Sequence, residues 1–147
     1  MGNETGPYLP ADIATLFPDH VSQGFWERCA RHELAFQRCS RCHAFRHPPA
    51  PICHVCRSSD VVWAPVEGRG RVYTYTIVTH PVHPALAHRG PFNIVLVEFP
   101  DAPGVRLVSN LVDTPPEAMA TGLEVEVVWE EPRPGTVLPR FRRARPA

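Results

Sequence analysis

Lysine is absent from this chain of 147 residues, because all fifteen of its basic residues are arginine. Fifteen acidic residues balance them, and a formal charge of zero argues against a global field that would draw the protein to nucleic acid or to an anionic membrane. A long apolar run is also lacking, and the first residues, "MGNETGPYLPADIATLFPDH", match neither a signal peptide nor a transmembrane segment. We therefore expect a cytoplasmic protein with no membrane partner.

Proline, in contrast, is abundant, with 18 residues that cluster in stretches such as "HPPAP" and "HPVHP". Proline clusters mark loops between short elements, and many short elements favour β structure. The length suits one domain with a sizeable core, or two very small domains that share a surface.

Four of the five cysteines form two C-x-x-C pairs that are ten residues apart: Cys39, Cys42, Cys53 and Cys56. Two such turns can direct four thiolates at one centre and complete the tetrahedral shell that Zn²⁺ prefers. The spacing therefore predicts a short zinc ribbon, with iron in the same shell, disulfides and a redox pair as alternatives. Because the shell is closed, the metal would be structural. Cys29 lies outside the pattern and is interpreted as a small apolar residue on a helix.

The residue after the second cysteine of a metal knuckle often takes a positive φ, which favours glycine. His43 and Arg57 occupy these two positions here. Both can adopt that conformation at some energetic cost, so the ligand set is retained.

A helical spacing of apolar residues precedes the cysteines, and an alternating pattern follows them. Phe25 and Trp26 lie on the expected helix, where the alternatives are packing against the ribbon and contact with a partner. A short helix is expected at 114–122, between the third and fourth of five strands, and that order is typical of an OB-fold barrel. The expected strands are 71–78, 92–99, 105–112, 124–130 and 137–142.

The predicted fold is therefore mainly β, with an N-terminal helix and a rubredoxin-like zinc ribbon that lead into a five-stranded OB-fold barrel. The residue ranges expected for these parts are 1–36 for the N-terminal segment with its helix, 37–66 for the ribbon, 67–143 for the barrel and 144–147 for the tail.

An ordered set of motifs over about residues 20–143 resembles the DUF35 family of small zinc-ribbon and OB-fold proteins. The motifs that carry this resemblance are "FWERCARHELAFQRCSRC", "PPAPICHVC", "GRGRVYTYTIV", "NIVLVEF", "VRLVSNLVD", "GLEVEVVWEE" and "LPRFR". The resemblance implies an accessory subunit that binds a thiolase-like enzyme (a thiolase or aldolase) or a hotdog-fold hydratase in a hetero-oligomer. It also implies a role in converting acyl-CoA in lipid, steroid or ketoacyl metabolism, with the catalytic residues on the partner.

The residues themselves agree with this expectation, because no nucleophile with a base at motif spacing and no Gly-rich phosphate loop is recognisable. We assign no catalytic residue. Arg89, Phe92 and Arg106 are candidate contacts for a CoA thioester, because guanidinium groups bind phosphate and the loop before Phe92 is partly apolar. Candidate residues of the partner interface are Phe25, Trp26, Tyr73 and Tyr75.

Two alternative functions remain open at this point. A single-stranded nucleic-acid-binding OB-fold would use Tyr73 and Tyr75 as a stacking face, although neutral charge and an acidic fourth strand disfavour it. A stand-alone acyl-CoA enzyme is the other alternative.

Overall fold

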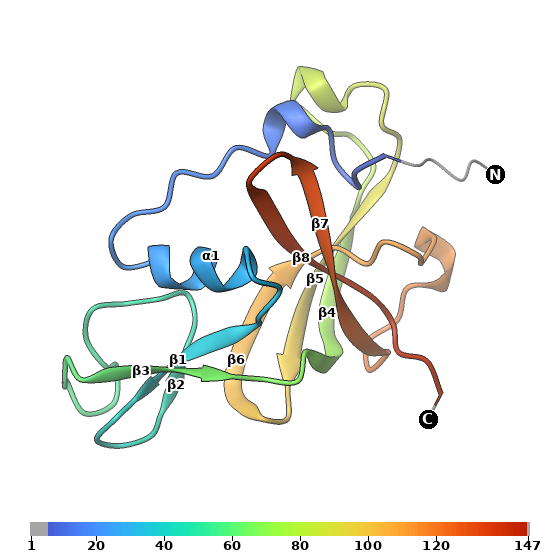
Figure 1. Ribbon diagram of the computed structural model, residues 1–147. Coiled ribbons are helices and arrows are strands. Elements are labelled where there is room, and N and C mark those ends of the chain that lie inside the picture. The colour runs from blue at the N-terminus through green and yellow to red at the C-terminus, as the bar shows by residue number, and fades with distance from the viewer. Residues whose placement is uncertain (1–5, 147) are drawn as a thin grey trace.

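The computed structural model describes residues 6–146, and its N-terminal part combines one α-helix with a small sheet (Figure 1). The sheet has the strand order β2-β1-β3, and both pairings are antiparallel. Its elements are the 3-10 turn η1 (Ala11–Ile13), the helix α1 (Gln23–Cys29) and the strands β1 (Ala35–Cys39), β2 (Phe45–Arg46) and β3 (Val61–Pro65). No helix in the described part of the chain is long and apolar enough to cross a membrane.

The second part is a curled sheet of five antiparallel strands with the order β6-β5-β4-β7-β8, as expected for an OB-like half-barrel. Its strands are β4 (Arg69–Val78), β5 (Phe92–Phe99), β6 (Ala102–Ser109), β7 (Glu124–Arg133) and β8 (Thr136–Arg143). Two 3-10 turns, η2 (Pro84–Leu86) and η3 (Pro116–Ala118), lie in the connections.

The mainly β architecture and all five strands of the barrel are thus confirmed, but the helix expected at 114–122 is wrong. Only the three residues of η3 are helical there. Pro115 is extended with a ψ of 158°, and the chain leaves the turn at Met119 with a ψ of 134°. The Tyr75 hydroxyl donates a hydrogen bond to the carbonyl of Met119 at 3.1 Å. This tertiary contact and the extended backbone on either side limit the segment to one turn.

The half-barrel closes where the chain after β6 meets β8. Leu111 and Phe141 form a parallel bridge, in which the Asn110 carbonyl accepts from the Phe141 N–H at 3.0 Å and the Phe141 carbonyl accepts from the Val112 N–H at 2.9 Å. The Asn93 side chain exchanges two hydrogen bonds of 2.8 Å with the Leu111 backbone, in place of a strand neighbour. These contacts join the two edge strands at one end.

The core is shared by the ribbon and the barrel. Phe36 on β1 is fully buried and its ring centroid lies 5.1 Å from that of Phe99 on β5, which lies 6.0 Å from that of Phe141 on β8. Phe25 and Cys29 of α1 belong to the same buried cluster. The two parts therefore pack as neighbours on one core, and the exact division at residues 36 and 66 stays a prediction.

A β-bulge in β4 places Tyr73 and Tyr75 differently from the expected single face. Val72 pairs with Val97 and Thr74 with Leu96, so Tyr73 is the extra residue. The alternation of side chains is reset by this insertion. Tyr73 is exposed, whereas Tyr75 packs against the core. The stacking face that the nucleic-acid alternative required is therefore not formed by these two residues.

The burial of His47 predicts a pH-dependent stability. Its ring lies between Phe25 and Phe36, with centroid distances of 5.0 and 5.2 Å, and its Nδ1 has no hydrogen-bond partner among the described residues. Burial lowers the pKa of His47 to about 4. An unfolded histidine has a pKa of about 6.5, so the unfolded state binds more protons between these values and stability falls as the pH falls. We expect His47 to lower the unfolding free energy by about 1 kcal/mol between pH 7.5 and pH 5.5.

Urea titrations of wild type and of His47→Phe at both pH values measure this contribution, because the variant lacks the titrating group. An equal loss of stability in both proteins on acidification would contradict the prediction.

Candidate functional site

The four cysteines of the two C-x-x-C pairs converge on one point at the end of the small sheet. Their Sγ atoms all lie within 4.8 Å of one another. The Cys39 and Cys56 sulfurs are 3.5 Å apart, as are those of Cys42 and Cys53. A disulfide needs about 2.05 Å, so the thiols are free, and sulfurs bound to zinc at about 2.3 Å in a tetrahedron lie about 3.8 Å apart. The arrangement fits a tetrahedral metal ion and does not fit a disulfide.

The backbone of each knuckle supports the thiolate form of its first cysteine. A hydrogen bond from the Cys42 N–H is the largest cause of the lowered pKa of the Cys39 thiol, and a bond from the Cys56 N–H is the largest cause that lowers the pKa of Cys53 to about 6. His43 and Arg57 take φ values of 63° and 64°, which confirms the knuckle conformation in the absence of glycine.

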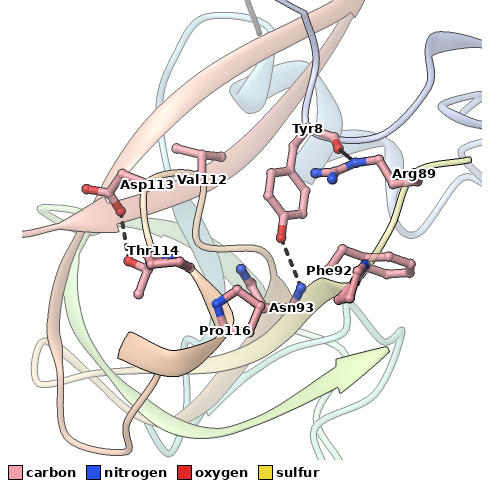
Figure 2. A pocket seen from close by; sticks show the side chains of 10 residues that line it. Tyr8, Arg89, Phe92, Asn93, Val112, Asp113, Thr114 and Pro116 are labelled. Carbon is pink, nitrogen blue, oxygen red and sulfur yellow. Dashed lines mark hydrogen bonds between the residues drawn. The ribbon is translucent and has the colours of Figure 1, made fainter. Parts of the chain in front are cut away.

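A second site is an open pocket of about 720 Å³ beside the start of β5, and Figure 2 shows the residues that line it. Arg89 and Phe92, two of the predicted CoA contacts, both lie in it. The Arg89 guanidinium stacks 4.8 Å above the Tyr8 ring and its Nε donates to the Tyr8 carbonyl at 2.8 Å. Asp113 brings a carboxylate to the opposite side. The pocket therefore offers the Arg89 guanidinium, the Asp113 carboxylate and the aromatic rings of Tyr8 and Phe92.

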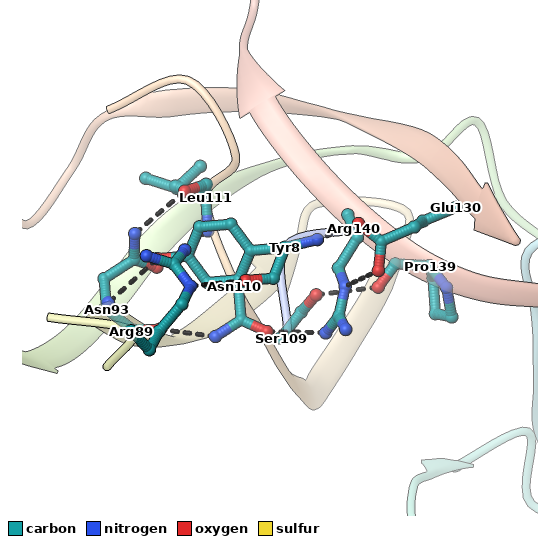
Figure 3. Close-up of polar contacts among 9 residues, drawn as sticks. All are labelled: Tyr8, Arg89, Asn93, Ser109, Asn110, Leu111, Glu130, Pro139 and Arg140. Carbon is teal, nitrogen blue, oxygen red and sulfur yellow. Dashed lines mark hydrogen bonds and ion pairs between the residues drawn. The ribbon is translucent and has the colours of Figure 1, made fainter. Parts of the chain in front are cut away.

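Tyr8 is fixed in this pocket by a polar network that runs through the end of the barrel (Figure 3). Its hydroxyl accepts from the Asn93 N–H at 2.9 Å, and its N–H donates to a Glu130 oxygen at 2.7 Å. Glu130 also pairs with Arg140 at 3.1 Å, and Arg140 donates to Asn110 at 2.5 Å. Asn110 in turn donates to the Asn93 carbonyl. Partly buried charges are thus paired and hydrogen-bonded, as burial requires.

A third site, the β6 groove, is a mostly apolar cavity of about 410 Å³ between α1, the loop after β2, and the strands β6 and β8. Trp26 and Arg106 both line it. The Arg106 guanidinium also lies 3.7 Å from the centroid of the Tyr73 ring on β4. Two predicted residues, Trp26 and Arg106, therefore line the groove, and Tyr73 contacts Arg106 from β4. The groove is lined by Ser22, Phe25, Trp26, His47, Pro48, Pro49, Arg106, Leu107, Val108, Leu138, Pro139 and Arg140.

The remaining predicted residues are separated from one another. Arg106 lies opposite Glu98 in the register of β5 and β6, near the far end of β5. At about 3.3 Å per residue, this position is about 20 Å from Phe92, so Arg106 does not share a pocket with Arg89. Phe25 is only 3% exposed and belongs to the buried core cluster, and its place in a partner interface stays a prediction. Sequence reasoning did not identify Tyr8 or Asn93, because a lone tyrosine near the start of the chain and a strand asparagine belong to no motif.

Comparisons with known proteins match both parts of the chain. The model of the rubredoxin-like zinc ribbon domain of ChsH2 matches residues 26–62, and that of the C-terminal OB-fold domain of ChsH2 matches residues 63–130. A solved chain described as Ltp2-ChsH2(DUF35) aldolase is 35% identical with a TM-score of 0.79, over 88% of this chain and 98% of that chain.

Curated relatives fall into two groups. A DUF35 domain-containing scaffold protein of Pyrococcus furiosus is 30% identical over 79% of this chain and 82% of that protein. A probable enoyl-CoA hydratase alpha subunit of Thermomonospora curvata is 42% identical over 83% of this chain, and the 3-oxo-4,17-pregnadiene-20-carboxyl-CoA hydratase alpha subunit of Mycobacterium tuberculosis is 31% identical over 71%. The matched regions span 37% and 32% of those two hydratase subunits, about a third of their length.

The cysteine cluster predicts how a single substitution changes metal content. We expect Cys42→Ser to release the metal and to lower the thermal midpoint, because three thiolates bind the ion more weakly and metal binding is coupled to folding. Elemental analysis and calorimetry of the purified variant measure both effects. Cys29→Ser, which removes a buried thiol outside the cluster, is the matched control and keeps its metal. Full metal occupancy and an unchanged midpoint in Cys42→Ser would refute the ligand assignment.

Proposed function

Since the chain belongs to the DUF35 family, we propose that it is a non-catalytic accessory subunit of an enzyme that converts acyl-CoA. Its partner is a thiolase-like enzyme or a hotdog-fold hydratase, and the two form a hetero-oligomer. The observation that carries the proposal is the 35% identity to a chain of an aldolase, over 98% of that chain. The relatives named as CoA hydratase alpha subunits support the same class of substrate.

The chemistry of the cysteines supports a non-catalytic role. Burial raises the pKa of the Cys29 thiol to about 12, so this residue carries no thiolate nucleophile at neutral pH. The other four thiols share one site that suits a structural Zn²⁺ ion. Four thiolates complete the coordination shell, which leaves no position for water or substrate. The metal then stabilises the small sheet on which Phe36 enters the shared core.

The pocket beside β5 is the best candidate for contact with a CoA thioester. The Arg89 guanidinium lies over the Tyr8 ring, and no carboxylate lies within ion-pair distance of it among the described residues. Such a fork of donors suits a phosphate group. Phe92 forms part of the floor, where it can contact an apolar portion of the ligand. If the partner enzyme covers this pocket, the pocket would line part of the path of the CoA thioester.

The proposal predicts a specific partner. Affinity isolation of the tagged chain from its native host, with mass spectrometry of the co-purifying proteins, is expected to recover a thiolase-like or hydratase subunit. We expect the isolated complex to convert acyl-CoA and to lose most of its activity when this chain is removed. Recovery of the chain alone or with nucleic acid, or full activity of the partner without it, would contradict the proposal.

The CoA contact makes a separate prediction in that complex. We expect Arg89→Gln to raise the KM for acyl-CoA about tenfold with little change in kcat, because a charge-assisted hydrogen bond contributes about 1.5 kcal/mol or more. Arg145→Gln removes the same charge from the exposed C-terminal tail and serves as the matched control. Equal KM values for the two variants would place the CoA contact elsewhere.

A further inference from the structure

We propose that Tyr8 positions the Arg89 guanidinium for contact with a phosphate group of the CoA thioester, so that the N-terminal segment forms part of the binding site. This inference rests on the proposed function, because Arg89 is the CoA contact proposed above. Tyr8 acts through Arg89 and is therefore a positioning residue.

Arg89 needs such support because of its place in the fold. It lies in the connection between β4 and β5, which runs over residues 79–91 and contains only the 3-10 turn η2. An arginine side chain that moves freely loses much rotamer freedom when it binds a ligand. A contact that orders the side chain in the free protein removes this loss from the binding step and so raises affinity.

Tyr8 contacts the Arg89 side chain at two points. The Tyr8 carbonyl accepts from Arg89 Nε at 2.8 Å, and the centre of the guanidinium lies 4.8 Å from the centroid of the Tyr8 ring. A cation within about 6 Å of a ring centroid is attracted to the ring. Because the guanidinium group is planar and rigid, these two contacts together restrict its position and its orientation.

The outer edge of the Arg89 guanidinium remains available to a ligand. Its Nε donor is the one that bonds to a residue within the described part of the chain, so the N–H groups of both Nη atoms are left. Parallel N–H groups on the two Nη atoms match two oxygens of a phosphate. Asp113 lies on the opposite side of the pocket (Figure 2) and repels an anion, which favours the Arg89 side for the phosphate.

Tyr8 can hold Arg89 because its own backbone and hydroxyl are tied to the barrel. Its N–H donates to Glu130 of β7 at 2.7 Å, and its hydroxyl accepts from the Asn93 N–H of β5 at 2.9 Å (Figure 3). Burial raises the pKa of Tyr8, so the hydroxyl is uncharged at neutral pH and does not neutralise Arg89. Arg89 is thereby connected through Tyr8 to two strands of the half-barrel.

Two other roles of Tyr8 lead to different outcomes. If Tyr8 only closed the end of the barrel, its removal would change stability without a specific change in the affinity for CoA. If Tyr8 occupied the place of the ligand, its removal would strengthen CoA binding. The contacts favour positioning, because the Nη groups of Arg89 remain unbonded while Tyr8 is in place.

The test uses the complex of this chain with its partner enzyme. Tyr8→Leu removes the ring and the hydroxyl, and we expect it to raise the KM for acyl-CoA about fivefold with little change in kcat. Tyr8→Phe, the conservative variant, retains the ring and is expected to restore the KM to within about twofold of wild type. It should still lower the thermal midpoint, because the buried Asn93 N–H loses its acceptor.

A double substitution separates positioning from a general loss of stability. In an Arg89→Gln background we expect Tyr8→Leu to change the KM by less than about twofold, because Tyr8 acts through Arg89. Equal factors in the two backgrounds, or a lower KM in Tyr8→Leu alone, would overturn the positioning role and leave the accessory role intact. An unchanged KM in Arg89→Gln alone would instead refute the CoA contact of the proposed function, and the phosphate assignment with it.

The free chain offers a readout that does not require the partner. Nuclear magnetic resonance of isotope-labelled arginine measures how fast the Arg89 Nε–H exchanges with water. We expect slow exchange in wild type and Tyr8→Phe and faster exchange in Tyr8→Leu, because the ring keeps the Nε bond to the Tyr8 carbonyl in place. Equal exchange rates in all three proteins would show that Tyr8 does not hold Arg89.

Discussion

The parallel bridge between Leu111 and Phe141 is the contact on which the shape of the barrel depends. A curled sheet of five strands has two edges, and unpaired edges invite association with other chains. Here the bridge joins the two edges at one end, and the Asn93 side chain completes the hydrogen bonds that a further strand would have made. The same contact sets the limit of closure, since the edges separate below Ser109 and leave the β6 groove. Barrel closure and the groove beside it are therefore two results of one local pairing.

The polar network around Tyr8 lies at the closed end, and the apolar groove lies below it. Glu130 accepts from the Tyr8 N–H and pairs with Arg140 where the chain after β6 crosses β8. This places the pocket with Arg89 on one side of the bridge and the β6 groove on the other. A partner that covers both would contact the N-terminal segment, the loop after β2 and two strands of the barrel. This arrangement supports the accessory role proposed above.

Much of the architecture could be predicted from the sequence, because the cysteine spacing and the alternating strands are local signals. The four ligands and the five barrel strands depend on residues that are close in the chain. The bulge at Tyr73 could not be predicted, since one inserted residue in β4 has no local signature and reverses the face of Tyr75. The turn at η3 was also missed, because Pro115 and Met119 take extended backbone and Met119 is tied to Tyr75. The separation of Arg106 from Arg89 depends on strand pairing, which only the three-dimensional structure supplies.

The ring contact of Phe36 with Phe99 has a consequence for how such chains diversify. A ribbon joined to the barrel only by a linker could be exchanged between relatives as an independent domain. Here the ribbon donates an aromatic side chain to the interior of its neighbour, and Phe25 and Cys29 of α1 enter the same cluster. Interiors are packed too closely to accept a foreign ring without loss of stability. A substitution at Phe36 therefore also disturbs Phe99, and the effects of changes at these two positions on stability are coupled.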